Sequence, residues 1–263
     1  MINNLKVSVV IPCYNSEKTI ERALDSINEQ SYKVSEIIIV DDASIDRTRD
    51  VISDWISSRK SHSIIKFIEN CVNSGVSASR NIGIAEASCD LIAFLDSDDA
   101  WNINKVKYQV SFFSSDPQLY LSFHGSENLS DKNVLTKFVN LHQNEKPLTK
   151  HSLLIKNTIP TRSVMMRNDK CFKFNESMSY SEDYDFWLRV CLSGRKIINM
   201  NVVLAYSFED EHHTGLSSHK VKMHNGVLET YRNIYKSKLI SRRMYFFLTG
   251  FQKFKNIYKR LVK

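Results

Sequence analysis

The sequence predicts an α/β fold built on a doubly wound, mostly parallel sheet, with a helical extension at the C-terminus. Short apolar runs rich in Val and Ile recur roughly every 30 residues through the first 100 residues. Patterns with helical spacing lie between these runs, and clusters of polar residues follow them. Strands buried on both faces give continuous apolar runs, and their alternation with helices is typical of a parallel sheet.

The apolar runs predict four strands, and the patterns between them predict three helices. We expect the strands at residues 7–11, 36–40, 63–68 and 91–96. The first helix should begin after Ser16, an expected N-cap, because apolar residues at helical spacing follow it, beginning with Ile20 and Leu24. The next two helices are expected around residues 51–56 and 78–85.

The second half of the chain gives a weaker pattern. A helix is expected after Trp101, a short strand at residues 120–123, a helix beginning near Glu182 and a strand at residues 197–206. Residues 126–160 are polar and show no clear periodicity, whereas residues 220–263 have a helical pattern.

Composition is that of an ordinary globular protein. The 263 residues are 42% hydrophobic and 25% charged. No basic segment precedes a long apolar run, and no window of about 18 uncharged apolar residues occurs, so we expect a cytoplasmic chain without a signal peptide or a membrane span. The five cysteines lack metal-ligand spacing and are expected to be free thiols.

Charge is distributed unevenly along the chain. Residues 220–263 contain 12 Lys or Arg and one acid, Glu229, for a net charge of +11. Because the whole chain carries +7, residues 1–219 carry −4. The basic tail indicates an acidic partner surface, and a solvated helix face is the alternative.

Three carboxylates, Asp96, Asp98 and Asp99, follow the fourth expected strand, with Ser97 among them. Carboxylates packed this closely repel one another at neutral pH, and a divalent cation would relieve that repulsion. Mg²⁺ and Mn²⁺ are hard cations that suit oxygen ligands and phosphate co-ligands. The alternative is an acidic turn without a metal.

Charged residues also follow the second and third expected strands. Asp41 and Asp42 end the second strand, and one of these carboxylates can accept a hydrogen bond from a base or a ribose hydroxyl. Helix capping by Ser44 or Asp46 is an alternative explanation of this polar cluster. Arg80 lies in the helix after the third strand, where it can pair with a diphosphate or with an acid on the helix surface.

An acidic pair, Glu182 and Asp183, starts the helix expected in the second half. The helix dipole stabilises carboxylates at this position, which is a sufficient structural reason for them. It also keeps a carboxylate ionised and available as a general base. The first strand is followed neither by GxGxxG nor by GxxxxGK[ST], which argues against a dinucleotide-binding Rossmann site and a P-loop.

Four segments together resemble family 2 glycosyltransferases, which have the GT-A fold, use nucleotide-sugar donors and invert the anomeric centre. The segments are VSVVIPCYNSEKTIERALDSI, EIIIVDDASIDRT, NSGVSASRNIGIAEASCDLIAFLDSDDAW and SEDYDFWLRV. The resemblance runs from about Val7 to Asp99 and resumes at Glu182. Four motifs in the same order make it specific.

The resemblance implies a role for each matching residue. Asp96 and Asp98 would form the DxD pair that holds Mn²⁺ or Mg²⁺, with Asp98 as the direct ligand. Asp183 would be the catalytic base, beside Glu182. The residues similar to the family's nucleotide-sugar contacts are Pro12, Tyr14, Asn15, Asp41, Asp42, Arg80, Asp96 and Ser97.

Two further features of the resemblance concern the second half. The segment His212–Ser218 resembles the family's late flexible loop, in which His213 would join the metal or the diphosphate; a surface pair of histidines explains it equally well. The QxxRW motif of processive relatives is missing, which favours a single addition. A catalytic domain is expected over residues 1–219, with its nucleotide-binding half at about 1–100 and its acceptor half at about 101–219.

The expected function is transfer of a sugar from a nucleotide-diphosphate donor, UDP by resemblance, to an acceptor hydroxyl. An oligosaccharide or lipid-linked acceptor in surface polysaccharide or lipopolysaccharide biosynthesis is the expected partner, and no nucleic acid is expected. One alternative is a nucleotidyltransferase, although no glycine-rich loop follows the first strand. Another is a basic nucleic-acid-binding protein, which the acidic body disfavours.

The basic tail, residues 220–263, combines its charge with an apolar stripe. Basic amphipathic helices lie in the headgroup region of anionic membranes, so we expect a peripheral position on the inner face of the cell membrane. Packing of the stripe on the catalytic domain or on a second subunit is the alternative. The stripe, at spacings of three and four residues, is Met244, Phe247, Phe251, Phe254, Tyr258 and Leu261.

Overall fold

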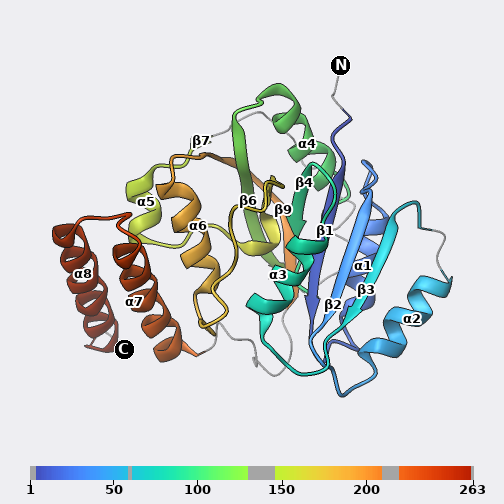
Figure 1. Cartoon of the computed structure of the whole chain (residues 1–263), viewed down its shortest axis with the longest axis horizontal. Coiled ribbons are helices and arrows are strands. Elements are labelled where there is room, and N and C mark those ends of the chain that lie inside the picture. Colours follow the sequence, from blue (N-terminus) through green and yellow to red (C-terminus); the bar gives the residue numbers. More distant parts are fainter. Residues whose placement is uncertain (1–3, 59–60, 130–145, 209–218, 262–263) are drawn as a thin grey trace.

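The computed structural model describes residues 4–58, 61–129, 146–208 and 219–261. In this part of the chain, one nine-stranded sheet runs through the molecule and carries helices on both faces (Figure 1). The strand order is β3-β2-β1-β4-β8-β6-β9-β5, and β7 pairs with β9 outside this path. The α/β, doubly wound prediction is therefore confirmed.

The first half of the chain forms the parallel part of the sheet, and all four predicted strands are present. The strand β1 continues past the expected end, whereas β4 stops at Phe94, so that Asp96 and Asp98 lie in a loop and Asp99 begins the next strand. The elements are β1 (Val7–Cys13), α1 (Ile20–Asn28), β2 (Glu36–Asp41), α2 (Thr48–Ser58), β3 (Ile64–Glu69), α3 (Val76–Glu86) and β4 (Leu91–Phe94).

The second half adds the two longest strands, β6 and β9, and three short strands, β5, β7 and β8, that pair antiparallel. The helix predicted near Glu182 and the strand predicted at 197–206 are confirmed. The elements are β5 (Asp99–Trp101), α4 (Lys105–Ser115), β6 (Leu119–Leu129), β7 (Lys146–Pro147), α5 (Lys150–Ile155), a 3₁₀ turn η2 (Thr161–Ser163), β8 (Met165–Arg167), α6 (Glu182–Leu192), β9 (Lys196–Phe208), α7 (Lys220–Lys236) and α8 (Arg242–Leu261).

Most of the strand pairing is parallel. The long pairs, β1 with β2, β2 with β3, and β6 with β9, are all parallel. The antiparallel pairs made by β5, β7 and β8 contain two or three residue pairs each. The strand expected at 120–123 is longer than predicted because the pairing of β6 with β9 extends to Leu129.

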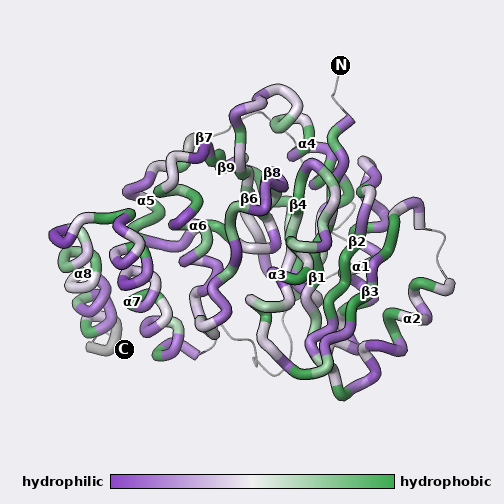
Figure 2. The backbone as a smooth tube through the Cα atoms, in the orientation of Figure 1, coloured by the Kyte–Doolittle hydropathy of each residue, from purple (hydrophilic) through white to green (hydrophobic). Residues whose placement is uncertain are grey.

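Alternate residues of β1 enter two separate cores. Val9 and Ile11 pack with α1, α2 and α4 on one face, while Val10 packs with α3 and α6 on the other. The approach of α3 is close, because a Cβ on Gly83 would lie 2.3 Å from a methyl group of Val10. Figure 2 shows the resulting hydrophobic interior along β1 and β2.

The expected N-cap role of Ser16 is wrong. The helix α1 begins at Ile20 after Thr19, without a side-chain cap. The Ser16 hydroxyl instead pairs with the Ser97 hydroxyl at 2.8 Å, and the Ser16 backbone N–H donates to the Thr48 hydroxyl. The first contact fixes the loop after β1 against the loop after β4, and the second fixes it against the start of α2.

The last two helices form a hairpin at the edge of the molecule, with α7 between α6 and α8 (Figure 1). Tyr231 and Ile234 of α7 and Leu248 of α8 belong to the same core as α6. Among the described helices, none is long and apolar enough to span a membrane.

Candidate active site

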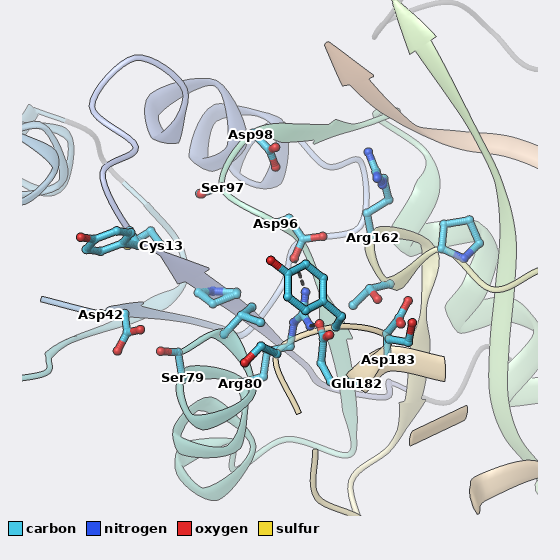
Figure 3. A pocket seen from close by; sticks show the side chains of 18 of the residues that line it. Cys13, Asp42, Ser79, Arg80, Asp96, Ser97, Asp98, Arg162, Glu182 and Asp183 are labelled. Atoms are coloured by element: carbon cyan, nitrogen blue, oxygen red, sulfur yellow. Dashed lines mark hydrogen bonds and ion pairs between the residues drawn. The ribbon is translucent and has the colours of Figure 1, made fainter. Parts of the chain in front are cut away.

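A cavity of about 440 Å³ lies at the carboxyl ends of β1 and β4, where ligands bind in doubly wound sheets (Figure 3). Its walls come from the segments after β1, β2 and β4, from α3, η2 and α7, and from the start of α6. The lining residues are Pro12, Cys13, Tyr14, Asp42, Val76, Ser79, Arg80, Asp96, Ser97, Asp98, Pro160, Thr161, Arg162, Ser179, Tyr180, Ser181, Glu182, Asp183 and Met223.

The cavity brings together most of the site residues expected from the sequence, although they come from both halves of the chain. Residues of the strand ends and residues of the acidic pair share its wall. The expected residues that line it are Pro12, Tyr14, Asp42, Arg80, Asp96, Ser97, Asp98, Glu182 and Asp183.

Arg80 links the two acidic motifs. Its guanidinium donates to the Asp96 Oδ1 at 2.7 Å and to the Glu182 Oε1 at 3.0 Å, and its side chain is nearly buried. Burial alone would raise the pKa of Asp96, but the charges of Arg80 and Arg162 outweigh it and hold the pKa below its usual value. Asp96 is therefore ionised, and the three side chains fix the loop after β4 against the start of α6.

Asp183 occupies a different environment from its neighbour Glu182. Burial, and then the charge of Glu182, raise the pKa of Asp183 to about 6, against the opposing effect of Arg80. Its Oδ2 accepts a hydrogen bond from the Asn157 side chain at 3.1 Å. A carboxylate with this pKa is mainly ionised at neutral pH and is basic enough to take a proton from a hydroxyl group.

The turn before α6 positions this carboxylate. Ser181 has a φ of 59°, which is rare for a residue with a side chain, and contacts from α7 support it. The Ser181 hydroxyl donates to the Met223 carbonyl at 3.3 Å. Gly226 lets α7 approach, because a Cβ there would lie 2.3 Å from the Tyr180 carbonyl oxygen.

The three carboxylates after β4 have separate roles. Asp96 pairs with Arg80, and Asp98 is exposed at the cavity, where its backbone carbonyl accepts from Arg22. Asp99 is buried and pairs with Arg162. Burial raises the pKa of Asp99 well above its usual value despite that arginine. Only Asp96 and Asp98 of this cluster line the cavity.

These two carboxylates fit a divalent cation that arrives with a nucleotide. In the described part of the chain, no three His, Cys, Asp or Glu residues are grouped closely enough to hold a metal by themselves. Mg²⁺ is commonly held by one or two carboxylates together with substrate phosphates and water. Asp98 and the Asp96 oxygen that does not contact Arg80 would supply such a set of ligands.

Two expected nucleotide contacts do not line the cavity. Asp41 is fully buried, and its carboxylate accepts from Arg49 at 2.7 Å and from the Ser44 backbone. The Asn15 side chain accepts from the Ile45 backbone at 3.0 Å and so braces the adjacent loop. As the capping alternative predicts, Asp46 accepts from the Thr48 backbone N–H at the start of α2.

Asp42 lines the cavity while it also shapes the loop before α3. Its carboxylate accepts from the Asn70 side chain and from the backbone N–H groups of Ser74 and Gly75, at 2.7–2.9 Å. Gly75 has a φ of 87°, a conformation that favours glycine. Tyr14 lies nearby with 46% of its surface exposed.

Several lining residues were not expected from the sequence. Arg162, Tyr180 and Met223 come from segments without a recognised motif, and Asn157 contacts Asp183 from outside the cavity wall. No local signal distinguishes them: Tyr180 lies only three residues before Asp183 but outside the recognised motif, and the folded chain brings the other three to the site. His213 lies outside the described residues.

Comparisons with known proteins identify the family of this chain. Residues 8–173 match the sequence model of the family described as Glycosyl transferase family 2. Two relatives from Escherichia coli, WfgD and WfaP, are described as UDP-Glc:alpha-D-GlcNAc-diphosphoundecaprenol beta-1,3-glucosyltransferases. WfgD is 30% identical over 82% of this chain and 81% of its own, and WfaP is 32% identical over 76% of each. The putative teichuronic acid biosynthesis glycosyltransferase TuaG of Bacillus subtilis is 30% identical over 87% of this chain and 88% of its own.

Solved structures share the fold at lower identity. S. aureus TarS in complex with UDP aligns with a TM-score of 0.65 and 19% identity, over 87% of this chain and 66% of that one. Mannosyltransferase PcManGT from Pyrobaculum calidifontis, in complex with GDP-Man and Mn²⁺, aligns with a TM-score of 0.65 and 16% identity, over 88% of this chain and 64% of that one. The family match and the relatives together show that this chain belongs to glycosyltransferase family 2, and that it has the GT-A fold.

Proposed function

We propose that this glycosyltransferase moves one sugar at a time from a UDP-sugar to a hydroxyl group of a lipid-linked oligosaccharide, with inversion and with Mn²⁺ or Mg²⁺ bound. The observation that carries the proposal is the single cavity in which Arg80 joins Asp96 to Glu182, beside Asp183. A carboxylate pair suited to a metal and a carboxylate with a raised pKa thus line the same cavity.

The donor would lie along the strand ends of the first half, residues 1–100. Tyr14 presents an exposed ring on which a base can stack, and Pro12 and Asp42 line the same side. UDP is proposed because WfgD and WfaP are named for UDP-Glc and TarS binds UDP. Asp41 and Asn15 would contribute by holding the loops around this part of the cavity.

A divalent cation held by Asp98 and Asp96 would neutralise the charge that builds on the leaving diphosphate. Arg80 keeps Asp96 ionised and in place, so the ligand set stays ordered before the nucleotide binds. A role for His213 at the metal or the diphosphate remains part of this proposal.

Asp183 would act on the acceptor as a general base. As the acceptor oxygen attacks the anomeric carbon, the Asp183 carboxylate takes the hydroxyl proton, which typically contributes about 10²- to 10⁴-fold. Attack opposite the departing diphosphate inverts the anomeric centre, so an α-linked donor gives a β-linked product. The missing QxxRW motif supports a single addition per binding event.

The acceptor would bind against the second half, residues 101–219. Its wall combines Pro160, Thr161 and Arg162 with Tyr180 and, from α7, Met223. A lipid-linked acceptor is proposed because WfgD and WfaP are named for a diphosphoundecaprenol substrate. Surface polysaccharide or lipopolysaccharide is the proposed end product. Such an acceptor places the enzyme at the inner face of the cell membrane.

The experiment that tests this proposal supplies purified protein with a panel of nucleotide sugars, an undecaprenyl-diphosphate-linked GlcNAc and Mn²⁺ or Mg²⁺. One UDP-sugar should give a lipid product longer by one residue, and excess chelator should abolish it. Sugar transfer at the full rate in excess chelator would contradict the proposed requirement for a divalent metal. A nucleotide bound covalently to the product would instead indicate a nucleotidyltransferase.

A further inference from the structure

The helix α8 carries a concentration of exposed apolar side chains. Among the described residues, twelve large hydrophobic side chains are exposed, and six of them lie on this one helix, each with 37–68% of its surface exposed. The other six are spread over distant elements. The six on α8 are Phe246, Phe247, Phe251, Phe254, Ile257 and Tyr258.

These side chains do not belong to the face by which α8 packs. That face contains Leu248, which is 1% exposed, and Met244 and Tyr245, which are partly buried. The Tyr245 ring stacks on Tyr235 of α7 with centroids 4.8 Å apart. Of the stripe expected from the sequence, Met244 therefore packs inward and Phe247, Phe251, Phe254 and Tyr258 face outward; the side chain of Leu261 lies outside the described residues.

Positive charge borders the exposed face. The sequence of α8 contains six Lys or Arg and no acid. Arg242, Arg243 and Lys253 are exposed and lie on the same side as Phe246 and Phe254. Hydrophilic and hydrophobic segments alternate along this helix at the edge of the molecule (Figure 2).

We propose that this aromatic face of α8, comprising the six residues named above, inserts into the headgroup region of an anionic phospholipid bilayer. Aromatic and aliphatic side chains gain from burial at the acyl boundary, and each basic residue near the surface adds roughly 1 kcal/mol of attraction. A second copy of the chain is a poorer occupant, because it would bring two faces of the same charge together.

The docking face is connected to the cavity through one hairpin. Met223 of α7 lines the cavity, and its carbonyl accepts from Ser181, two residues before Asp183. The same hairpin holds α8 through the Tyr235 and Tyr245 rings. Docking would therefore place the acceptor wall beside the bilayer. The identity of that wall rests on the proposed lipid-linked acceptor, whereas the docking of α8 does not depend on it.

The experiment measures binding of the full chain to vesicles of zwitterionic phospholipid, with or without a large fraction of anionic phospholipid. Substitution is preferable to truncation, because removal of α8 would take Leu248 out of the core. One variant carries Phe247→Ser, Phe254→Ser and Tyr258→Ser, and a second carries Arg242→Gln, Arg243→Gln and Lys253→Gln. The matched control carries Ile64→Ser and Val72→Ser, which removes two apolar side chains elsewhere that are 64% and 68% exposed.

We expect the chain to bind anionic vesicles and each α8 variant to lose roughly 100-fold in partitioning, with the control unchanged. UDP-dependent thermal stabilisation, measured in the same samples without lipid, should be equal in all variants, so a failure of docking is distinguishable from a failure of donor binding. Binding that ignores the α8 substitutions would overturn the proposal. A wild-type dimer that the aromatic variant converts to a monomer, without an effect on vesicle binding, would do so too.

Discussion

The two walls of the cavity are built in different ways. On the proposed donor side, Tyr14 directly follows the parallel strand β1, Asp42 directly follows β2, and Asp96 lies two residues after β4. On the proposed acceptor side, Arg162, Tyr180 and Met223 come from a short turn, a loop and the start of a long helix. The donor wall is thus set by local sequence and sheet topology, whereas the acceptor wall depends on how distant segments pack.

This difference indicates a division of labour that can be tested. Changes in the donor wall should alter nucleotide binding, and changes at Asp183 should alter turnover alone. Arg80 is where the two walls meet, because it contacts Asp96 on one side and Glu182 on the other.

The largest effect is expected for Asp183→Asn. Loss of the base should lower kcat by about 10²- to 10⁴-fold and leave the donor Kd nearly unchanged, because the group acts on the acceptor. Steady-state kinetics together with calorimetric titration of the UDP-sugar measure the two quantities. Glu182→Gln should have a milder effect on kcat; the reverse order would identify Glu182 as the base.

A smaller effect, of about 10²-fold in turnover, is expected for Asp98→Asn. This substitution should also weaken UDP-sugar binding in the presence of Mn²⁺ but not in excess chelator, since the lost contact runs through the metal. Binding titrations with and without chelator make the comparison. An unchanged metal requirement would remove Asp98 from the ligand set.

Much of the proposed donor wall could be predicted from the sequence. An apolar run followed by Asp-Ser-Asp-Asp is a buried parallel strand whose carboxyl end leads into the acidic residues, and such residues lie at the carboxyl edge of the sheet, where ligands bind. The ion pair of Arg80 with Glu182 could not be predicted, since the two residues lie 102 positions apart and meet only through the packing of α3 and α6. Asp41 shows a second limit. The sequence places it correctly at the end of β2, but its contact with Arg49 turns it away from the cavity.

The pH dependence of turnover should report on Asp183 of the proposed acceptor side. We expect kcat to fall about tenfold between pH 7 and pH 5. The pKa of Asp183 is raised to about 6, so its base form is lost as the pH falls through that value and kcat should fall with it. Because folding raises the pKa of Asp183, protonation of this carboxyl adds to the free energy of unfolding at low pH, and that contribution is lost as the pH rises through about 6. Rates measured for Asp183→Asn should lack this limb.

The smallest effect is expected for Tyr14→Ala, about fivefold in donor Kd, because one aromatic ring stacked on a base contributes roughly 1 kcal/mol at the lower end of its range. Tyr14→Phe keeps the ring and should bind as the native chain does. Equal binding by Tyr14→Ala would place the base elsewhere in the cavity. If Tyr14→Ala greatly lowered kcat without changing the donor Kd, the separate roles assigned to the two walls would be contradicted.

The central claim is a single displacement in one cavity, with Asp183 on the acceptor side and the leaving diphosphate on the donor side. The configuration of the new glycosidic bond tests it most directly. Proton NMR of the product made by the native chain from an α-linked UDP-sugar should show a β anomer in the first turnovers. An α-linked product would require two displacements or a front-side path, and it would contradict the role assigned to Asp183.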